Sequence, residues 1–192
     1  MFIENTTSSL FRKGCIEVVC GSMFSGKTEE LIRRLKRARI ARLKVEIVKP
    51  IIDIRYHKDN VVSHDATEIK AIPVKDSKEI FEKVGQVDVL GIDEAQFFDK
   101  GLPKVCEKLA RKGIRIIIAG LDMDYNGKPF GPMPALMARA EYVTKVHAIC
   151  MRCGDLASHS YRKEKKKNLV LLGGKDNYEA LCRNCFNSSV KK

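Results

Sequence analysis

Eight residues near the start of the chain constrain its fold more than any other segment. They read GSMFSGKT and fit the pattern Gly-x-x-x-x-Gly-Lys-[Ser/Thr]. The segment follows a short β-branched run and precedes a stretch with helical composition, which is the context in which this pattern binds phosphate. There the loop N–H groups and the helix N-terminus face the phosphates, while the lysine reaches the outer ones. The sequence therefore predicts a nucleoside triphosphate site formed by Gly21, Ser22, Met23, Phe24, Ser25, Gly26, Lys27 and Thr28.

Apolar runs alternate with helical segments through the first three quarters of the chain. Strands alternating with helices predict βαβ units and an α/β fold with a parallel sheet. We expect a nucleotide-binding domain over residues 1–147, with residues 50–75 as a polar, β-rich insertion lying over the sheet. The expected strands are 15–20, 45–48, 87–92 and 115–121, and the expected helices are 29–42 and 104–112.

Two acids end one of these apolar runs. Asp93 and Glu94 directly follow Val89–Ile92. Sites in parallel sheets form at the carboxyl ends of strands, so Asp93 should emerge beside the phosphate loop and share Mg²⁺ with Thr28. Glu94 could accept a proton from a nucleophile, although it could also be only a loop acid beside the metal ligand.

Aromatic residues follow the carboxyl ends of two predicted strands. Phe97 and Phe98 come soon after the two acids, and Tyr125 and Phe130 follow the next strand. Aromatic side chains grouped around a base indicate a pocket for a flat ring. We expect Phe97 and Phe130 in this pocket and Phe98 in the core.

Four of the seven cysteines form two Cys-x-x-Cys pairs. Two such pairs close a tetrahedral zinc site, and four protein ligands leave no open position, so the zinc should be structural. The alternative, two separate redox pairs, is weaker because neither pair lies at a strand–helix junction of the thioredoxin type. We expect a small β-rich module over residues 148–192, a lid over the active site between the pairs, and buried thiols elsewhere in the core. The predicted zinc ligands are Cys150, Cys153, Cys182 and Cys185, and the predicted core thiols are Cys15, Cys20 and Cys106.

The formal net charge of +12 points to anionic ligands. Much of it lies on the helix after the phosphate loop, where a nucleic-acid-binding face is conceivable but a solvated face is the more usual reading. No apolar run approaches the length of a membrane span, and the N-terminal residues do not resemble a signal peptide. We therefore expect a cytoplasmic protein with neither a nucleic-acid nor a membrane partner. The basic residues of the helix are Arg33, Arg34, Lys36, Arg37, Arg39 and Arg42.

Taken together, these motifs resemble type II thymidine kinases over roughly residues 14–186. The resemblance lies in the phosphate loop, the two cysteine pairs, Gly173-Gly174 followed by Tyr178, and the segments DIRY (53–56), DEAQFF (93–98) and KPFG (128–131). It implies a P-loop, RecA-like sheet with a zinc-ribbon and lasso domain. It also implies transfer of the γ-phosphate of Mg-ATP to the 5′-hydroxyl of thymidine, giving dTMP for nucleotide salvage. A homotetramer and feedback inhibition by dTTP are implied by the resemblance alone.

The same resemblance implies roles for individual residues. Glu94 resembles the general base and Arg55, oriented by Asp53, a group that stabilises the transferring phosphate. ATP contacts extend from the phosphate loop to Asp93, Glu94, Ala95 and Gln96. Thymidine, with deoxyuridine as a second substrate, would contact Met23, Phe97, Leu121, Tyr125, Phe130, Ser160, Gly174 and Tyr178.

Two other classes of protein remain as alternatives. A nucleic-acid-stimulated ATPase with a zinc ribbon would share the basic helix and the acid pair, but one chain of 192 residues cannot hold the paired domains of a helicase. A zinc-ribbon binding module with a vestigial nucleotide site would not need an intact phosphate loop followed by Asp93 and Glu94.

Overall fold

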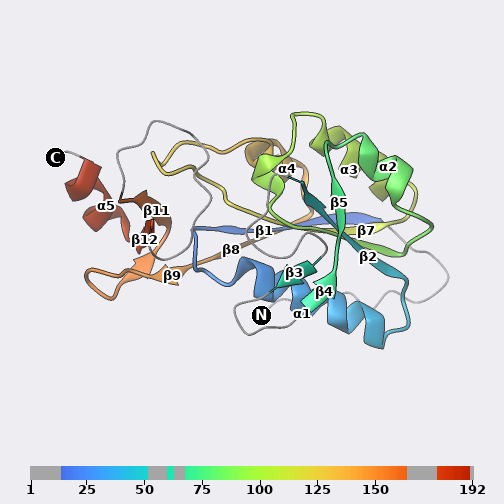
Figure 1. Cartoon of the computed structure of the whole chain (residues 1–192), viewed down its shortest axis with the longest axis horizontal. Coiled ribbons are helices and arrows are strands. Elements are labelled where there is room, and N and C mark those ends of the chain that lie inside the picture. The colour runs from blue at the N-terminus through green and yellow to red at the C-terminus, as the bar shows by residue number, and fades with distance from the viewer. Residues whose placement is uncertain (1–13, 52–59, 63–67, 164–176, 191–192) are drawn as a thin grey trace.

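The computed structural model describes residues 14–51, 60–62, 68–163 and 177–190. Its centre is a six-stranded sheet in the order β5-β2-β6-β7-β1-β8, in which each neighbouring pair is parallel (Figure 1). This arrangement confirms the predicted α/β class. The strands are β1 (Cys15–Gly21), β2 (Val45–Pro50), β5 (Ile72–Val74), β6 (Val89–Ile92), β7 (Arg115–Gly120) and β8 (Tyr142–Val146).

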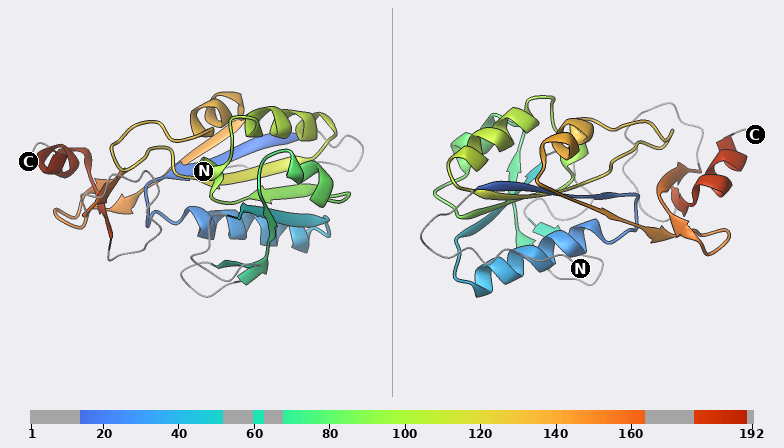
Figure 2. Two further views of the ribbon diagram at one scale, coloured as in Figure 1. Left: turned by 45° about the horizontal axis from the view of Figure 1, so that its top comes forward. Right: turned by 180° about the vertical axis from the view of Figure 1, so that it is seen from behind.

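Helices cover both faces of this sheet (Figure 2). On β7, Ile116 and Ile118 pack with the helices of one face, and Ile117 and Ala119 pack with α1 on the other. This alternation follows from the two-residue period of a strand, and each isoleucine removed from water contributes about 1.5–3 kcal/mol. No helix in the described ranges is long and apolar enough to cross a membrane. One face carries α1 (Lys27–Ile40), and the other carries α2 (Glu79–Lys83), α3 (Leu102–Arg111) and α4 (Met133–Arg139).

The prediction that residues 50–75 form an insertion outside the main sheet is wrong for the last of these residues. Strands β3 (Asn60–Val62) and β4 (Glu68–Lys70) do form a separate antiparallel pair. Residues 72–74, however, form β5, the edge strand of the main sheet, with Val48 opposite Ile72. Pro73 weakens the strand pattern of this short segment, but an edge strand tolerates proline because one of its sides needs no hydrogen-bond donor.

The basic face of α1 also differs from the expectation at one residue. Arg34 is buried, with 1% of its side chain exposed, and its Nη1 lies 2.8 Å from Glu17 Oε2. It also bonds Glu30 and Thr144, while Arg115 Nε lies 2.6 Å from the other oxygen of Glu17. Arg34 therefore ties α1 to β1 and β8 instead of facing solvent. The remaining basic residues of the helix and its end are exposed, as expected: Arg33, Lys36, Arg37, Arg39 and Arg42.

Residues 148–163 and 177–190 form a small module after β8, called the cysteine module below. Strand β9 (Ala148–Ile149) pairs with β10 (Leu156–Ala157), and β11 (His159–Arg162) pairs with β12 (Tyr178–Leu181). Helix α5 (Arg183–Val190) follows, and a small apolar cluster includes Leu181 and Phe186. The module is β-rich as predicted; the domain boundary at residue 147 stays a prediction.

Candidate active site

The phosphate loop lies between the end of β1 and the start of α1, as its sequence context predicts. Two glycines make its path possible. A Cβ atom on Gly21 would lie 2.2 Å from the carbonyl oxygen of Val146, so only glycine lets the loop start this close to β8. Gly26 caps α1 with φ at 82°, a left-handed conformation that side chains rarely adopt. The first N–H groups of α1 consequently point into the turn, where they can bind an anion.

The ammonium group of Lys27 lies within this loop. Its Nζ donates a hydrogen bond of 2.6 Å to the carbonyl oxygen of Ser22. Burial lowers the pKa of Lys27, and the negative charges of Glu94, Asp93 and Asp122 oppose that shift. Removal from water strengthens the attraction of the ammonium group for a phosphate. The acids at the ends of β6 and β7 act on the lysine instead, by favouring its charged form.

Asp93 reaches the phosphate loop from the end of β6. Both of its carboxylate oxygens lie 3.4 Å from Thr28 Oγ1. The carboxylate also accepts a 3.0 Å hydrogen bond from the backbone N–H of Glu94. A hydroxyl and a carboxylate side by side supply the oxygen ligands that Mg²⁺ prefers, so the residues present fit a magnesium-bound triphosphate.

Glu94 stands on strained backbone and is braced by a buried amide. Its φ and ψ of 50° and 42° lie in the left-handed region, which is uncommon for glutamate. Gln96 donates from Nε2 to Glu94 Oε2, while its Oε1 accepts a 2.9 Å bond from the backbone N–H of Leu121. Gln96 thus joins Glu94 to the loop after β7, a contact that its place in the sequence did not reveal. Ala95, beside it, packs fully buried in the apolar core.

The aromatic residues after β6 and β7 lie in two different environments. Phe98 is 5% exposed and packs in the core, as predicted. Phe97 and Phe130 meet edge to face, with ring centroids 5.8 Å apart and planes at 87°. Their contact brings the segment after β6 against the segment after β7. Phe130 is held there by its backbone N–H, which donates to the carbonyl oxygen of Asp122 at 3.1 Å.

Strand β11 of the cysteine module lies against the phosphate loop. The N–H of Met23 donates a 3.0 Å hydrogen bond to Ser160 Oγ, and Ser22 Oγ donates to the carbonyl oxygen of Ala157 at 3.3 Å. Phe24 also packs against the apolar cluster of the module. The loop that should hold phosphate and the strand that should contact the nucleoside are therefore in direct contact.

Arg162, at the end of β11, joins two of the predicted pocket residues. Its guanidinium carbon lies 3.5 Å from the ring centroid of Tyr125 and 5.8 Å from that of Tyr178. The sequence showed Arg162 only as the first residue of a basic run, so it gave no reason to expect this contact. Arg55, Asp53 and Gly174 lie outside the described residues.

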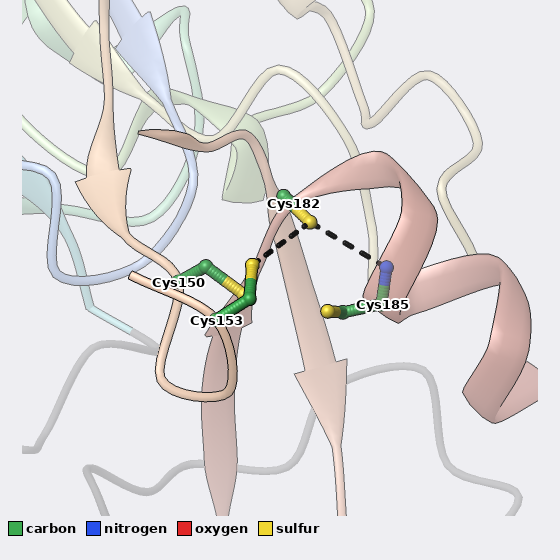
Figure 3. A group of neighbouring side chains, drawn as sticks. All are labelled: Cys150, Cys153, Cys182 and Cys185. Atoms are coloured by element: carbon green, nitrogen blue, oxygen red, sulfur yellow. Dashed lines mark hydrogen bonds between the residues drawn. The ribbon is translucent and has the colours of Figure 1, made fainter. Parts of the chain in front are cut away.

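The four cysteines of the two pairs converge on one point (Figure 3). Their sulfur atoms all lie within 4.8 Å of one another, and the Sγ atoms of Cys153 and Cys182 are 3.6 Å apart. Tetrahedral zinc with bonds of about 2.3 Å places its sulfur ligands about 3.8 Å apart, so the cluster fits zinc. Burial opposes ionisation of Cys150, but the backbone N–H groups of Cys182, Arg152 and Cys153 outweigh it and lower the pKa of this thiol to about 6. The neighbouring thiols of Cys182 and Cys153 instead raise the pKa of Cys185 to about 12. Because zinc binds thiolates, its binding to the cluster must release protons.

The three remaining cysteines are of a different kind. Cys20 and Cys106 are buried in the core, and Cys15 is half-buried at the start of β1. Burial raises the pKa of Cys106 to about 12 and is also the largest cause that raises the pKa of Cys15 and Cys20 to about 11. Cys20 and Cys106 are therefore core thiols, as predicted, whereas the prediction is wrong for Cys15, which is only half-buried at the start of β1.

Comparison with known proteins agrees with this site. A family model described as thymidine kinase matches residues 14–186. The chain belongs to the thymidine kinase family. This confirms the resemblance drawn from the motifs and makes the protein a nucleotide-binding kinase.

Individual relatives cover nearly the whole chain. A thymidine kinase of Bacteroides fragilis is 56% identical over 100% of this chain and 96% of its own. One of Bacteroides thetaiotaomicron is 59% identical over 97% and 94%, and one of Porphyromonas gingivalis 58% identical over 96% and 90%. Among solved structures, the genome packaging NTPase B204 of Sulfolobus turreted icosahedral virus 2 overlaps distantly, with 17% identity and a TM-score of 0.46 over 71% of this chain and 75% of that one.

Proposed function

We propose that the protein transfers the γ-phosphate of Mg-ATP to the 5′-hydroxyl of thymidine, giving dTMP for pyrimidine nucleotide salvage. The observation that carries this proposal is the junction of β6 with the phosphate loop. Asp93 lies 3.4 Å from Thr28, and the next residue, Glu94, is held by Gln96 against the segment that bears the aromatic pocket. A base held between a triphosphate loop and an aromatic pocket suits transfer of phosphate to a nucleoside hydroxyl.

The phosphate end of the site binds and orients ATP. The N–H groups of the phosphate loop, the N-terminus of α1 and Lys27 bind the phosphates, with further ATP contacts from residues 93–96. Thr28 and Asp93 would hold a magnesium ion, which would neutralise part of the negative charge of the triphosphate. Because little covalent chemistry falls to the protein in such a transfer, positioning and electrostatic stabilisation supply most of the catalysis.

Glu94 acts as the general base. Its carboxylate takes the proton of the 5′-hydroxyl as the bond from O5′ to the γ-phosphorus forms and the bond to the bridging oxygen of ADP breaks. The Gln96 amide, which donates to Glu94, fixes the direction of the carboxylate. Arg55 stabilises the charge on the transferring phosphoryl group; this role rests on the family resemblance.

The thymine ring lies among Met23, Phe97, Leu121, Tyr125 and Phe130. An apolar wall of this kind admits the 5-methyl group but discriminates weakly against its loss, because one methyl is worth only about 1–3 kcal/mol. Deoxyuridine is therefore accepted as well, and purines are rejected by size. Ser160 and Tyr178 contribute further contacts from the cysteine module, and a contact from Gly174 rests on the family resemblance. Cys150, Cys153, Cys182 and Cys185 would hold a structural zinc ion that stabilises this module.

We also propose four further properties, of which inhibition by dTTP and assembly into a tetramer rest on the family resemblance. The enzyme is inhibited by dTTP, the end product of its pathway. It acts as a homotetramer in the cytoplasm. Residues 1–147 form its nucleotide-binding domain, and residues 148–192 form the zinc-ribbon and lasso domain.

The experiment that tests this function measures phosphate transfer from Mg-ATP to a panel of nucleosides, with and without single-stranded DNA. We expect phosphorylation of thymidine, with deoxyuridine close behind, no reaction with purine nucleosides and no effect of DNA. Hydrolysis of ATP that rises with DNA and yields no phosphorylated nucleoside would instead assign the protein to the DNA-stimulated ATPases. Tight binding of Mg-ATP with no turnover on any acceptor would make the nucleotide site vestigial.

A further inference from the structure

We propose that Arg162 is a positioning residue for the nucleoside, holding the aromatic wall of the pocket at a fixed distance from the phosphate loop. The inference rests on the proposed function, since it takes Tyr125 as a wall of the nucleoside pocket. Arg162, which begins a basic run of the sequence, would contribute to nucleoside binding through its contact with Tyr125.

The position of Arg162 is unusual for a charged residue. It is 5% exposed, although it begins the basic run 162–167. Its guanidinium carbon lies 3.5 Å from the centroid of Tyr125, which is van der Waals contact with the face of the ring. Tyr178, its partner across the β11–β12 pair, presents a second ring 5.8 Å away. Arg162 therefore joins the loop after β7 to both strands of the module.

The chemistry of this contact selects arginine. Removing a charge from water is costly, and a ring face offsets part of that cost through its negative quadrupole. A guanidinium is flat and weakly hydrated, so it can stack on the ring, whereas a lysine ammonium is a strongly hydrated point charge. The contact thus fixes both the orientation of the Tyr125 ring and the distance of the ring from β11.

The same strand is bound to the phosphate loop by a neighbouring residue. Ser160 and Arg162 are two residues apart on β11 and so lie on one face of the strand. Ser160 Oγ accepts from the N–H of Met23 at 3.0 Å, and Arg162 stacks on Tyr125. One face of β11 thereby spans the two ends of the site, with Ser160 at the phosphate loop and Arg162 at the aromatic wall.

A second contact joins the same loop to the module. At Gly127, φ is 75°, and a Cβ atom there would lie 3.3 Å from the ring of Phe186 and 3.6 Å from that of His159. The loop after β7 thus packs on the module beside Tyr125 as well as through it. Loss of Arg162 should therefore loosen the ring of Tyr125 without detaching the loop.

The test compares kinetic constants for the two substrates in the full-length, zinc-loaded enzyme. Arg162→Met keeps the length of the side chain and removes its charge and plane. We expect the KM for thymidine to rise on the order of tenfold, with the KM for ATP and the zinc content within twofold of the wild type. Arg162→Lys should recover only a small part of this loss, because it restores the charge without the plane.

Arg152→Met is the matched control. Arg152 also stacks on a tyrosine of the module, with its guanidinium carbon 5.2 Å from the centroid of Tyr161, and pairs with Glu179 at 3.1 Å. Its side chain is 43% exposed, and its contacts lie within the module. We expect it to leave both KM values unchanged.

Coupling to Tyr125 separates positioning from a general loss of stability. In a Tyr125→Leu background, Arg162→Lys should no longer change the KM for thymidine, because the ring that it positions is gone. The inference is overturned if Arg162→Lys acts equally in both backgrounds, if both KM values rise together, or if the KM for thymidine does not change. A wild-type enzyme that fails to phosphorylate thymidine would instead overturn the proposed function, so the two failures are distinguishable.

Discussion

One strand, one turn and one helix fix the phosphate end of the site, whereas the nucleoside end draws on several distant segments. Gly21–Thr28 connect β1 to α1, and Asp93 joins them from the end of β6, two strands away in the same sheet. The residues proposed for the nucleoside pocket come from the phosphate loop, from the segments after β6 and β7, and from β11 and β12. The first end is therefore specified locally, and the second exists only when the cysteine module is in place.

The two ends also depend on different sources of stability. The helix behind the phosphate loop packs on the sheet and is tied to it by the buried pair of Arg34 and Glu17. The cysteine module has only a small apolar cluster among its described residues, so we expect a metal at the four cysteines to supply much of its stability. It follows that a change in the cysteine module should weaken thymidine binding while leaving ATP binding largely intact.

Loss of the metal should produce the largest difference between the effects on thymidine binding and on ATP binding. Cys182→Ser removes one ligand, and we expect zinc content to fall from one per chain to near zero, with thymidine binding weakened by at least about 100-fold, since the fold of such a module depends on its metal. Affinity for a non-hydrolysable ATP analogue should change by less than about fivefold, because its loop is held by β1 and α1. Metal analysis and calorimetric titration with each ligand measure these quantities.

Cys15→Ser is the control for this experiment, because Cys15 lies at the start of β1 and belongs to the other class of thiols. It should keep both the zinc and the affinity for thymidine. Equal losses of affinity for the two ligands in Cys182→Ser would contradict the separation.

A smaller effect is expected at the anchor of α1. Arg34→Met leaves Glu17 with one of its two guanidinium partners, and removing one member of a buried ion pair costs up to about 3–5 kcal/mol. We expect a loss of about 3 kcal/mol in the free energy of unfolding, measured in urea, with zinc content unchanged. Arg33→Met, one position earlier, removes an exposed pair with Glu30 and should cost no more than about 0.5 kcal/mol. Similar losses in the two variants would show that Arg34 anchors nothing.

The smallest effect concerns pH and the core thiols. The pKa of Cys106 is raised to about 12 by burial, so the folded state keeps its proton at a pH where the unfolded state has lost it. The unfolded chain then binds fewer protons than the folded one between about pH 9 and 12, and stability falls as pH rises through that window. The slope is about 1.4 kcal/mol per pH unit for this one thiol.

Cys106→Ala isolates this contribution. It lowers stability at pH 8 by leaving a small cavity, but we expect the difference from the wild type to shrink between pH 9 and 10.5, as measured by urea unfolding under reducing conditions. The zinc thiols titrate in both proteins and cancel in the difference. A constant difference across this range would mean that Cys106 ionises normally in the folded state.

Much of the fold could be predicted because many of its strands and helices can be recognised from the pattern of apolar residues in their own sequence. The four apolar runs predicted as strands correspond to β1, β2, β6 and β7, and the predicted helix 104–112 corresponds to most of α3. The missed strand β5 has three residues and contains Pro73, so its pairing is decided by the neighbouring β2 and not by its own sequence. Arg34 was assigned to a solvated face because helical charge runs usually are solvated, and its acid partner Glu17 lies on another element.

The site shows the same division. The phosphate loop and the cysteine pairs have fixed spacings that follow from their chemistry, so their residues could be named in advance. Arg162 stands in a basic run, and only the tertiary structure brings it against Tyr125 and Tyr178. Gln96 is likewise informative only once the backbone of Leu121 is seen to reach it.

The most direct test of the proposed chemistry is the single-turnover rate of phosphate transfer to thymidine in Glu94→Gln. Glutamine keeps the size of the side chain and can still accept from Gln96, but it cannot take a proton. We expect binding of ATP and thymidine to stay within a fewfold of the wild type and the transfer rate to fall about 100-fold to 10,000-fold, while Glu107→Gln, on the surface of α3 against Arg139, leaves the rate unchanged. Transfer by Glu94→Gln at the wild-type rate would show that Glu94 is not the base.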